Sequence, residues 1–352
     1  MTAPDRAAPQ PSGALLEAED LVQTFHASGG GRVQALSGVS FSLHRGETLG
    51  VVGESGSGKS TLARALMHLP PPESGAVRFA GESLTAMPPA QLRRRRSGFQ
   101  MVFQDPVSSL NPAHRIHDIV EMPLRVAGLR DAAERRRRVS EAMAAVGLSY
   151  EDFARRRPYE LSGGQCQRVS IARALVSRPD LLICDEAVSA LDVSVQAQVL
   201  NLLEDAKDAY ALTMVFISHD LGVVRGISDR VMVMYLGKVC EIAPTDALYA
   251  APLHPYTAML LESVPTLKAS RRVARPPQVR GETPSPLQVP SGCRFRTRCP
   301  AATDLCAQRE PPLLPVGAQG RSVACHHPRL LLEDAACAEA GPTPSREPQR
   351  LV

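Results

Sequence analysis

The sequence has no run of about 18 consecutive apolar residues, the minimum that a membrane-spanning helix requires. The chain is therefore expected not to cross a membrane, although 44% of its 352 residues are hydrophobic. Residues 1–13 are polar and rich in Pro and Ala, and they lack the apolar centre of a secretory signal peptide, which predicts a cytosolic protein. These residues and the Ala-, Glu- and Pro-rich residues 331–352 are expected to be disordered.

The chain also lacks a strong excess of charge, an internal repeat and a sustained heptad pattern. Its formal net charge is +4, and arginine is dense at residues 93–96, 135–138 and 155–157. Runs of this kind are most often solvated faces of helices, so no nucleic acid is expected as a partner. The missing heptads argue against a long coiled coil.

The most informative stretch is Gly-Glu-Ser-Gly-Ser-Gly-Lys-Ser at residues 53–60, which fits the phosphate-loop pattern G-x-x-x-x-G-K-[ST]. Apolar residues 48–52 before it predict a short buried strand, and residues 61–69 after it predict a helix. Glycines allow backbone N–H groups to turn towards an anion, and a helix N-terminus adds unpaired donors. Lys59 is expected to reach the β- and γ-phosphates, and the Ser60 hydroxyl to bind Mg²⁺. The residues expected to contact the nucleotide here are Gly53, Gly56, Gly58, Lys59, Ser60 and Thr61.

A pair of adjacent carboxylates supplies the second metal ligand and the base that a phosphate loop alone lacks. The apolar run at residues 181–184 predicts a buried strand, and Asp185 and Glu186 follow it directly. Asp185 is expected to hold Mg²⁺, often through water, and Glu186 to orient and deprotonate an attacking water. The alternative is an ordinary surface turn, which the phosphate loop upstream makes the weaker interpretation.

A second helix N-terminus is predicted at Leu-Ser-Gly-Gly-Gln, residues 161–165, before a helix at residues 166–175. This motif can bind an anion, or Ser162 can simply cap the helix. One chain does not need two such sites for one nucleotide, unless the second serves a nucleotide that a partner chain holds.

With these three motifs, residues 15–245 resemble the ATP-binding cassette ATPases. In that family two subunits enclose two ATP molecules head to tail, each bound by the phosphate loop of one chain and the Leu-Ser-Gly-Gly-Gln motif of the other. The resemblance therefore implies ATP and Mg²⁺ as cofactors and a second ATPase subunit, the same chain or a related one, as a partner. The residues that it assigns to the shared nucleotide are Ser162, Gly163, Gly164, Gln165 and, at the end of the Ser-Ala-Leu-Asp loop, Asp192.

The resemblance assigns further roles to single residues. Gln104 matches a glutamine that senses Mg²⁺ and water, in a loop that also meets the membrane subunit, and His219 matches a histidine that contacts the γ-phosphate. Phe25 matches an aromatic ring that stacks on adenine, although a place in the core of a sheet is the alternative. Two positions depart from the common pattern without removing a reacting group: Ala187, where proline is frequent, and Cys166, which opens the second helix.

Three stretches narrow the resemblance to the ATPase subunits of oligopeptide, dipeptide and nickel importers, and extend it to about residue 328. They are Phe-Gln-Asp-Pro at residues 103–106 with Ser-Leu-Asn-Pro at 109–112, Cys-Asp-Glu at 184–186, and Pro-Leu-His-Pro-Tyr-Thr at 252–257. The last of these belongs to a C-terminal extension that this group shares.

The extension contains four of the eight cysteines of the chain: Cys293, Cys299, Cys306 and Cys325. In a cytosolic protein such thiols are interpreted as metal ligands before disulfides, and thiolates suit zinc or an iron–sulfur cluster. Relatives with this segment can carry a four-iron cluster, so the resemblance suggests a [4Fe–4S] cluster here. His326 and His327 keep zinc as an alternative, and four unrelated cysteines are the third interpretation.

The predicted fold is α/β: a P-loop nucleotide hydrolase core with an antiparallel β subdomain, a helical subdomain at about residues 106–170, and a small C-terminal extension. The ATPase domain is expected at residues 14–245 and the extension at 246–330, with an irregular, Pro- and Arg-rich stretch at 265–291. Besides the strands named above, strands are predicted at residues 21–25, 39–43, 76–79, 99–103 and 214–217, a helix at 194–210, and a hairpin at 231–242 that turns at Gly237.

The resemblance implies an ATP-binding and ATP-hydrolysing subunit of a membrane importer that energises the uptake of oligopeptides or dipeptides. Its expected partners are the second ATPase subunit, two transmembrane permease subunits and an extracellular or periplasmic solute-binding protein. Its expected place is the cytoplasmic face of the cell membrane, as a peripheral subunit. The alternatives are uptake of nickel or another small solute, a cassette ATPase without a membrane partner, and a metal-sensing regulator.

Overall fold

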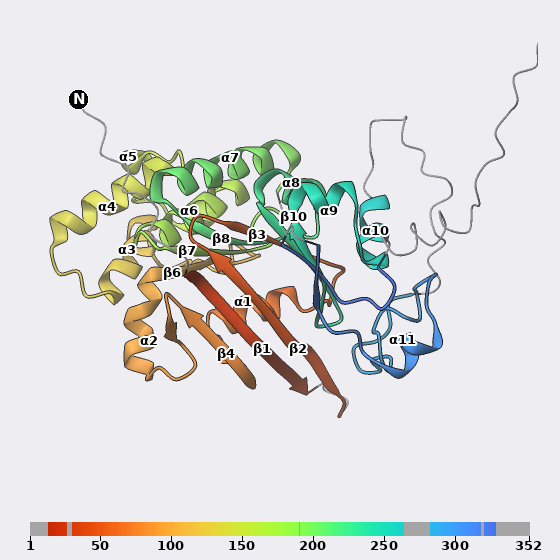
Figure 1. Cartoon of the computed structure of the whole chain (residues 1–352). Coiled ribbons are helices and arrows are strands. Elements are labelled where there is room, and N and C mark those ends of the chain that lie inside the picture. The colour runs from red at the N-terminus through yellow and green to blue at the C-terminus, as the bar shows by residue number, and fades with distance from the viewer. Residues whose placement is uncertain (1–12, 27–29, 190, 264–281, 318–319, 329–352) are drawn as a thin grey trace, which may run out of the picture. The chain divides into compact units, whose positions relative to one another are not determined.

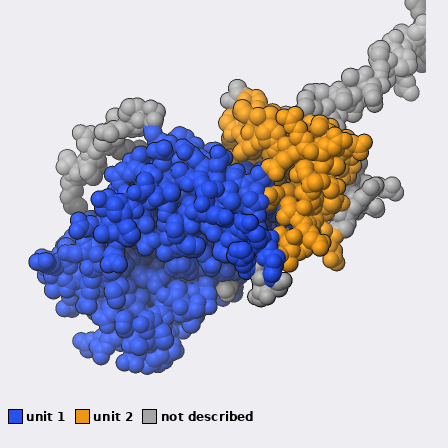
Figure 2. Space-filling view, turned by 90° about the horizontal axis from the view of Figure 1, so that it is seen from below, with its two compact units in different colours: residues 1–239 blue, residues 240–352 orange. Residues whose placement is uncertain are grey.

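The computed structural model describes residues 13–26, 30–189, 191–263, 282–317 and 320–328 (Figure 1). The chain divides into two compact units, residues 1–239 and 240–352, which Figure 2 colours separately and which are described one at a time below. Residues 1–12 and 331–352, predicted to be disordered, lie outside the described residues. So do Ala190 of the Ser-Ala-Leu-Asp loop and most of the predicted irregular stretch at residues 265–291.

The first unit contains a four-stranded antiparallel sheet. In pairing order its strands are β2 (Arg32–His44), β1 (Ala14–His26), β4 (Ser74–Phe79) and β5 (Glu82–Ser83). Val39 and Leu43 are fully buried on β2 and Phe41 is 8% exposed, as the alternating sequence predicts for a strand with one face in the core. The predicted antiparallel β subdomain is confirmed.

A parallel sheet forms the centre of the first unit. In pairing order its strands here are β9 (Arg230–Tyr235), β3 (Thr48–Val52), β8 (Thr213–Ile217), β7 (Leu181–Asp185) and β6 (Phe99–Val102). Every residue of β3, β7 and β8 is buried, which explains their unbroken apolar sequences. Because these strands are parallel, the loops after β3, β6, β7 and β8 leave from the same edge of the sheet. Each of these loops contains predicted site residues.

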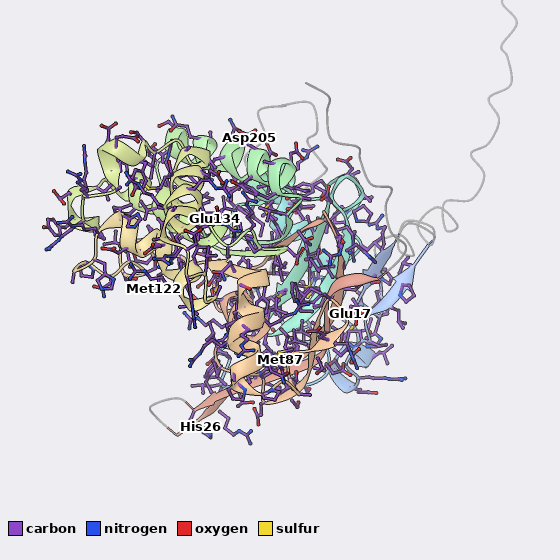
Figure 3. All side chains as sticks on the ribbon, turned by 90° about the vertical axis from the view of Figure 1, so that its left-hand side faces the viewer. Glu17, His26, Met87, Met122, Glu134 and Asp205 are labelled. Atoms are coloured by element: carbon purple, nitrogen blue, oxygen red, sulfur yellow. The ribbon has the colours of Figure 1, made fainter. Side chains whose placement is uncertain are left out.

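Helices surround the parallel sheet and also form a layer of their own, in which α3, α4 and α6 pack against one another (Figure 1). Figure 3 shows Met122 on α3 and Glu134 on α4, well away from His26 on β1. Gly128, Gly147 and Pro158 all fall between helices of this layer. The described helices of the first unit are α1 (Lys59–Leu66), α2 (Pro89–Arg95), α3 (Ile116–Val126), α4 (Ala132–Ala145), α5 (Tyr150–Phe153), α6 (Gly163–Leu175), α7 (Val193–Tyr210) and α8 (Leu221–Ile227), with 3₁₀ turns at Arg96–Gly98 and Pro158–Glu160.

Helix α1 ends three residues earlier than the sequence predicts. The helix begins at Lys59 and ends at Leu66, because His68 adopts a left-handed φ of 54°. The His68 amide then donates to the Ala65 carbonyl oxygen at 3.0 Å, and the Leu69 amide donates to the Arg64 carbonyl oxygen at 2.8 Å. This pair of bonds is the Schellman arrangement, in which glycine usually takes the left-handed position, so the side chain at residue 68 did not indicate where the helix ends.

The second unit is small and is built around the end of strand β10 (Lys238–Pro244), which starts after a turn at Gly237 with a φ of 79°. Strand β12 (Arg321–Val323) pairs antiparallel with β10, and β11 (Leu314–Val316) pairs with β12. The helices described in this unit are α9 (Thr245–Ala250), α10 (Pro255–Glu262) and α11 (Asp304–Gln308). Among the described residues of both units, no helix combines the length and the apolar character needed to cross a membrane.

Candidate functional site

The phosphate loop joins β3 to α1, and close backbone contacts require its glycines. A Cβ atom at Gly58 would lie 2.3 Å from the carbonyl oxygen of Ala35, and one at Gly53 would lie 2.2 Å from that of Met234. Gly56 and Gly58 have φ values of 77° and 102°, which favour glycine. The shape of the loop therefore depends on three of its predicted residues.

Lys59, the first residue of α1, is buried and folds back over the loop. Its Nζ atom donates to the carbonyl oxygens of Gly53 at 2.7 Å and Glu54 at 2.9 Å, and lies 3.4 Å from Ser57 Oγ. Burial lowers the pKa of Lys59, while neighbouring carboxylates, first among them Glu186, oppose this shift. The loop itself thus holds the ammonium group within the predicted phosphate site.

Ser60 and Asp185 are brought together from α1 and from the end of β7. Ser60 Oγ donates to Asp185 Oδ1 at 2.9 Å, and Asp185 is only 2% exposed. Burial raises the pKa of Asp185, and the hydrogen bond from Ser60 opposes this rise. A carboxylate and a hydroxyl are oxygen ligands of the kind that Mg²⁺ prefers, so this pair fits the predicted ion. Thr61 follows on α1 and is half-buried.

Three loops of this sheet edge meet at Glu186. Gln104, which follows β6, donates from Nε2 to Glu186 Oε2 at 2.8 Å. His219, which follows β8, has its Nδ1 atom 3.7 Å from Glu186 Oε1. The Glu186 backbone has a left-handed φ of 48°, and such a costly conformation in a residue other than glycine often marks a functional site. The three residues predicted to act in catalysis therefore lie together.

The Leu-Ser-Gly-Gly-Gln motif forms the N-terminus of α6, and its hydrogen bonds are local. Ser162 Oγ accepts from the Gln165 amide at 3.3 Å, and Gln165 Oε1 accepts from the Ser162 amide at 3.0 Å, which together form a capping box. Ser162 and Gly163 are exposed, and a Cβ atom at Gly164 would lie 2.8 Å from Val195 Cγ1. Within the described residues, none of the motif's hydrogen bonds reaches the phosphate loop of the same chain.

Asp192 and Phe25 are the remaining candidates in the first unit. Asp192 caps α7, accepting from the Val195 amide at 3.0 Å and from Ser194 Oγ at 2.7 Å. The hydrogen bond from Ser194 lowers the pKa of Asp192. Phe25, on β1, is 43% exposed and so is not the sheet-core residue that was the alternative for it. An exposed ring can instead receive a stacked ligand.

In the second unit the four predicted cysteines line one small cavity, together with residues that include His254 and Phe295. Burial raises the pKa of Cys299 to about 11 and that of Cys325 to about 12. Amide donors oppose this effect and stabilise thiolates, the form that binds metals, so the donor set fits a metal–thiolate site. The amides that donate to sulfur are those of Phe295 and Arg296 to Cys293, of Ala301 to Cys299, and of His327 to Cys325.

The two histidines that kept zinc as an alternative both have protein partners. His326 Nε2 lies 2.9 Å from the Arg309 carbonyl oxygen, and His327 Nε2 lies 2.9 Å from Thr303 Oγ1. Thr303 Oγ1 in turn lies 3.7 Å from Cys306 Sγ. A ligating histidine commonly bonds its other ring nitrogen to a carbonyl oxygen or a similar partner, so these contacts leave zinc as an alternative.

Cys240, on β10, is a fifth thiol near this group that sequence reasoning missed. Its carbonyl oxygen accepts from the Ala324 amide at 2.8 Å, directly before Cys325. Burial, followed by the charge of Cys293, raises the pKa of Cys240 well above its usual value. Cys240 is not among the residues that line the cavity. Only the pairing of β10 with β12 brings it close, so no local sequence pattern could reveal it.

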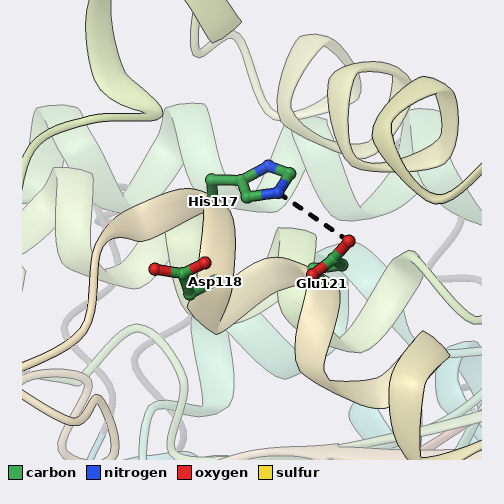
Figure 4. Close-up of side chains that lie close together, drawn as sticks. All are labelled: His117, Asp118 and Glu121. Carbon is green, nitrogen blue, oxygen red and sulfur yellow. Dashed lines mark ion pairs between the residues drawn. The ribbon is translucent and has the colours of Figure 1, made fainter. Parts of the chain in front are cut away.

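A second grouping of possible metal ligands lies on α3. His117, Asp118 and Glu121 offer ligand atoms within 4.8 Å of one another (Figure 4). Glu121 is already paired, because Arg135 Nε donates to it at 2.8 Å and Arg125 forms a further ion pair with it. His117 Nε2 lies 3.8 Å from the same carboxylate. These contacts identify an ion-pair network that joins α3 to α4. Its arginines already neutralise the negative charge of Glu121 that a metal ion would need.

Two protein-family models match the chain. The model described as "ABC transporter" matches residues 36–189, and the one described as "Oligopeptide/dipeptide transporter, C-terminal region" matches residues 240–306. The phosphate loop and the carboxylate pair lie within the first match, and three of the four cysteines lie within the second.

Characterised relatives match over almost the whole chain. The oligopeptide transport ATP-binding protein AppF of Bacillus subtilis is 48% identical over 320 residues, covering 89% of this chain and 97% of the relative. The di/tripeptide transport ATP-binding protein DppF of Pseudomonas aeruginosa is 46% identical over 323 residues, covering 90% and 99%. The oligopeptide transport ATP-binding protein OppF of Escherichia coli is 47% identical over 321 residues, covering 88% and 95%.

A solved structure supports the same likeness in three dimensions. The dimeric, post-hydrolysis structure of the ATP-binding cassette MJ0796 bound to ADP and phosphate superimposes with a TM-score of 0.60 and 30% sequence identity. The match covers 65% of this chain and 98% of that one.

Proposed function

Because the chain belongs to the ATP-binding cassette family, in the group of oligopeptide and dipeptide transport ATPases, we propose that it hydrolyses ATP to energise peptide uptake through a membrane importer. The observation that carries the proposal is the meeting of Gln104 and His219 at Glu186, beside the Ser60–Asp185 pair. This edge of the sheet holds a phosphate loop, oxygen ligands and a carboxylate in one place, which are the parts that phosphoryl transfer to water requires.

In the proposed reaction the phosphate loop and Lys59 bind the phosphates of ATP. The Lys59 ammonium exchanges its loop carbonyls for the β- and γ-phosphates. Ser60 and Asp185 would hold Mg²⁺, which neutralises charge on the phosphate oxygens when bound. Glu186 orients the attacking water and accepts its proton, Gln104 holds the Glu186 carboxylate in place, and His219 contacts the γ-phosphate. Positioning and charge stabilisation, not covalent chemistry, lower the barrier.

We propose further that each ATP site is shared between two chains, the same or related. Ser162, Gly163, Gly164 and Gln165 would complete the site of the partner, with Asp192 of the Ser-Ala-Leu-Asp loop beside them. Support comes from the exposure of Ser162 and Gly163 and from the local character of the motif's hydrogen bonds. Phe25, with its exposed ring, would stack on adenine.

The membrane partners proposed are two transmembrane permease subunits, served by an extracellular or periplasmic solute-binding protein. We therefore propose that the chain works at the cytoplasmic face of the cell membrane. Exposed apolar side chains near the start of the helical layer support a docking role: Val107 is 55% exposed, Val126 is 56% exposed and Met122 is 39% exposed. Val107 lies three residues after Gln104, whose side chain donates to Glu186. A partner that contacts Val107 would therefore be close to the loop that positions the Glu186 carboxylate.

For the second unit we propose that Cys293, Cys299, Cys306 and Cys325 hold a [4Fe–4S] cluster, with zinc as the alternative. A tetrahedral zinc site with Zn–S bonds of about 2.3 Å places its sulfurs roughly 3.8 Å apart. Among the described residues, these cysteines form no group of three ligand atoms within 4.8 Å of one another. This wider spacing favours a cluster, whose role would be mainly structural. Iron, sulfide and zinc analysis after anaerobic purification decides between them.

We propose the domain division of residues 14–245 for the ATPase and 246–330 for the extension. Support for a boundary in this region comes from the division into compact units between residues 239 and 240. The match to the C-terminal family model also begins at residue 240. The change of unit falls inside β10, which runs from Lys238 to Pro244.

Reconstitution tests the proposed function. The chain, its second ATPase subunit and the two permeases are placed in proteoliposomes with the binding protein and ATP, and entry of a labelled tripeptide is measured. We expect uptake that requires ATP and is lost with Glu186→Gln. Uptake of nickel without peptide would support the alternative solute, and ATP hydrolysis unaffected by binding protein, peptide or nickel would contradict a role in import.

A further inference from the structure

Two buried polar side chains, Glu241 and His254, stand next to the cysteine cavity. Glu241, on β10, is fully buried, and its carboxylate accepts from the Leu253 amide at 3.0 Å and from the His254 amide at 2.9 Å. Arg321 Nη2 lies 3.4 Å from the same carboxylate. A buried charge is costly unless it is satisfied in this way, so these contacts fix the turn that carries His254.

Both nitrogens of the His254 ring have partners. Nδ1 accepts from the Tyr256 amide at 3.0 Å and so caps α10. The ring also makes a hydrogen bond to the backbone of Ala324. Because Nδ1 carries no proton, we assign this bond to Nε2–H, which donates to the Ala324 carbonyl oxygen. Burial lowers the pKa of His254 to about 4, although the hydrogen bond to Ala324 opposes this shift. With this lowered pKa the ring is neutral at pH 7.

The bond to Ala324 matters because Cys325 reaches the cavity from a different segment than the other three cysteines. Cys293 and Cys306 are tied directly, since the Cys293 amide donates to the Cys306 carbonyl oxygen at 2.8 Å. Cys325 instead follows the end of β12, and the amide of Ala324 before it is held by the Cys240 carbonyl oxygen at 2.8 Å. With the amide and the carbonyl of Ala324 both held, the position of Cys325 is set.

We propose that His254, fixed by Glu241, is a positioning residue for the cysteine site: it holds the Ala324 carbonyl so that Cys325 faces the other three thiols. The inference rests on the proposed metal–thiolate site. It gives a role to the histidine of the Pro-Leu-His-Pro-Tyr-Thr stretch, whose ring lies 5.9 Å from the ring of Phe295 between Cys293 and Cys299. Residues that orient metal ligands typically change metal affinity about 10–100-fold when they are replaced.

Two substitutions of His254 separate positioning from capping. In His254→Gln the amide nitrogen stands in for Nε2 and can still donate to Ala324, but the cap of α10 is lost. In His254→Asn the amide oxygen stands in for Nδ1 and keeps the cap, but nothing reaches Ala324. The full-length variants and wild type are purified anaerobically, iron, sulfide and zinc are measured per chain, and retention is then followed against a chelator.

We expect His254→Gln to retain metal against the chelator like the wild type. We expect His254→Asn to bind the metal about 10–100-fold more weakly, and Cys325→Ser to lose it as well. Equal metal retention by both variants would overturn the positioning role, and so would loss of metal from His254→Gln but not from His254→Asn. If wild type itself contains no metal, the proposed metal site fails, and alkylation followed by mass spectrometry still tests positioning. Faster labelling of Cys325, but not of Cys293, in His254→Asn alone supports it, and identical labelling in both variants overturns it.

Discussion

At the scale of single residues, the carboxylate of Glu186 is the group on which the chemistry depends. Gln104 donates to one of its oxygens, and His219 approaches the other. Glu186→Gln keeps the shape of the side chain but removes the base, so ATP hydrolysis should fall at least about 100-fold while ATP still binds. Turnover and a nucleotide titration on the same preparation check this. Hydrolysis at the wild-type rate would show that Glu186 is not the base.

Lys59 makes a different contribution, because it binds charge and does not move protons. Lys59→Ala should weaken ATP affinity about 10–100-fold, since a charge-assisted contact to phosphate is lost. Lys207→Ala is the matched control, because Lys207 lies on α7 and pairs with Asp229, outside the nucleotide-binding motifs, and its loss should leave affinity unchanged. If calorimetry finds the same dissociation constant for both variants and the wild type, Lys59 does not contact the phosphates.

Residue identities in the nucleotide site could be predicted because each motif carries its own chemistry over a few positions. The contacts between motifs could not. The hydrogen bond from Gln104 to Glu186 joins the loops that follow the separate strands β6 and β7, and the sequence gives no distance between these loops. His254 shows the same limit, since its motif was noticed without a role and its partner Ala324 lies far along the chain.

At the scale of elements, helix ends were the least predictable feature. Strands with unbroken apolar sequences, such as β3 and β8, lie where the sequence predicts them. Helix α1 ends early because His68 takes a left-handed conformation that glycine usually takes. Ala211 takes the same conformation after α7, with a φ of 51°, although that helix ends at Tyr210 as the sequence predicts. Such ends depend on backbone hydrogen bonds that side-chain periodicity does not report.

Ala211 allows a direct test of this account of helix ends. Ala211 is exposed and left-handed, so Ala211→Gly should raise the free energy of unfolding by roughly 0.5–1 kcal/mol, as strain at Cβ is relieved. Ala197→Gly, exposed in the interior of α7, is the same substitution in a regular part of the same helix and should lower it by about 1 kcal/mol. Urea unfolding measures both. Destabilisation of similar size by the two changes would refute the argument.

The cysteine segment makes a prediction about which thiols bind metal. Cys306 lines the cavity, whereas Cys240 lies close to it on β10 but is not among its lining residues. Cys306→Ser should therefore lose bound metal and loosen residues 290–317, and Cys240→Val should keep the metal. Metal analysis with hydrogen exchange of the full chain checks both, and ATP hydrolysis should be preserved in each. Loss of metal in Cys240→Val would place the fifth thiol among the ligands.

At the scale of the whole molecule, the described chain contains the motifs of an ATPase, but it does not bring all of them together in one site. The phosphate loop, Asp185 and Glu186 lie together, whereas the Leu-Ser-Gly-Gly-Gln motif is bonded only within its own helix end. The central claim is that this motif serves the nucleotide of a second chain. Two anion-binding helix ends in one chain left a shared site open, and the resemblance to the ATP-binding cassette ATPases implied it. A single chain cannot test this claim.

The most direct measurement compares ATP turnover in two mixed dimers of differently tagged chains. In the first, one chain carries Lys59→Ala and the other carries Ser162→Arg, so a shared arrangement puts both lesions on one site and leaves the other intact. In the second, both substitutions are on one chain and its partner is wild type, which damages both shared sites. The account predicts that the first dimer hydrolyses ATP at up to about half the wild-type rate and the second far more slowly. Faster hydrolysis by the second dimer would show that each chain completes its own site.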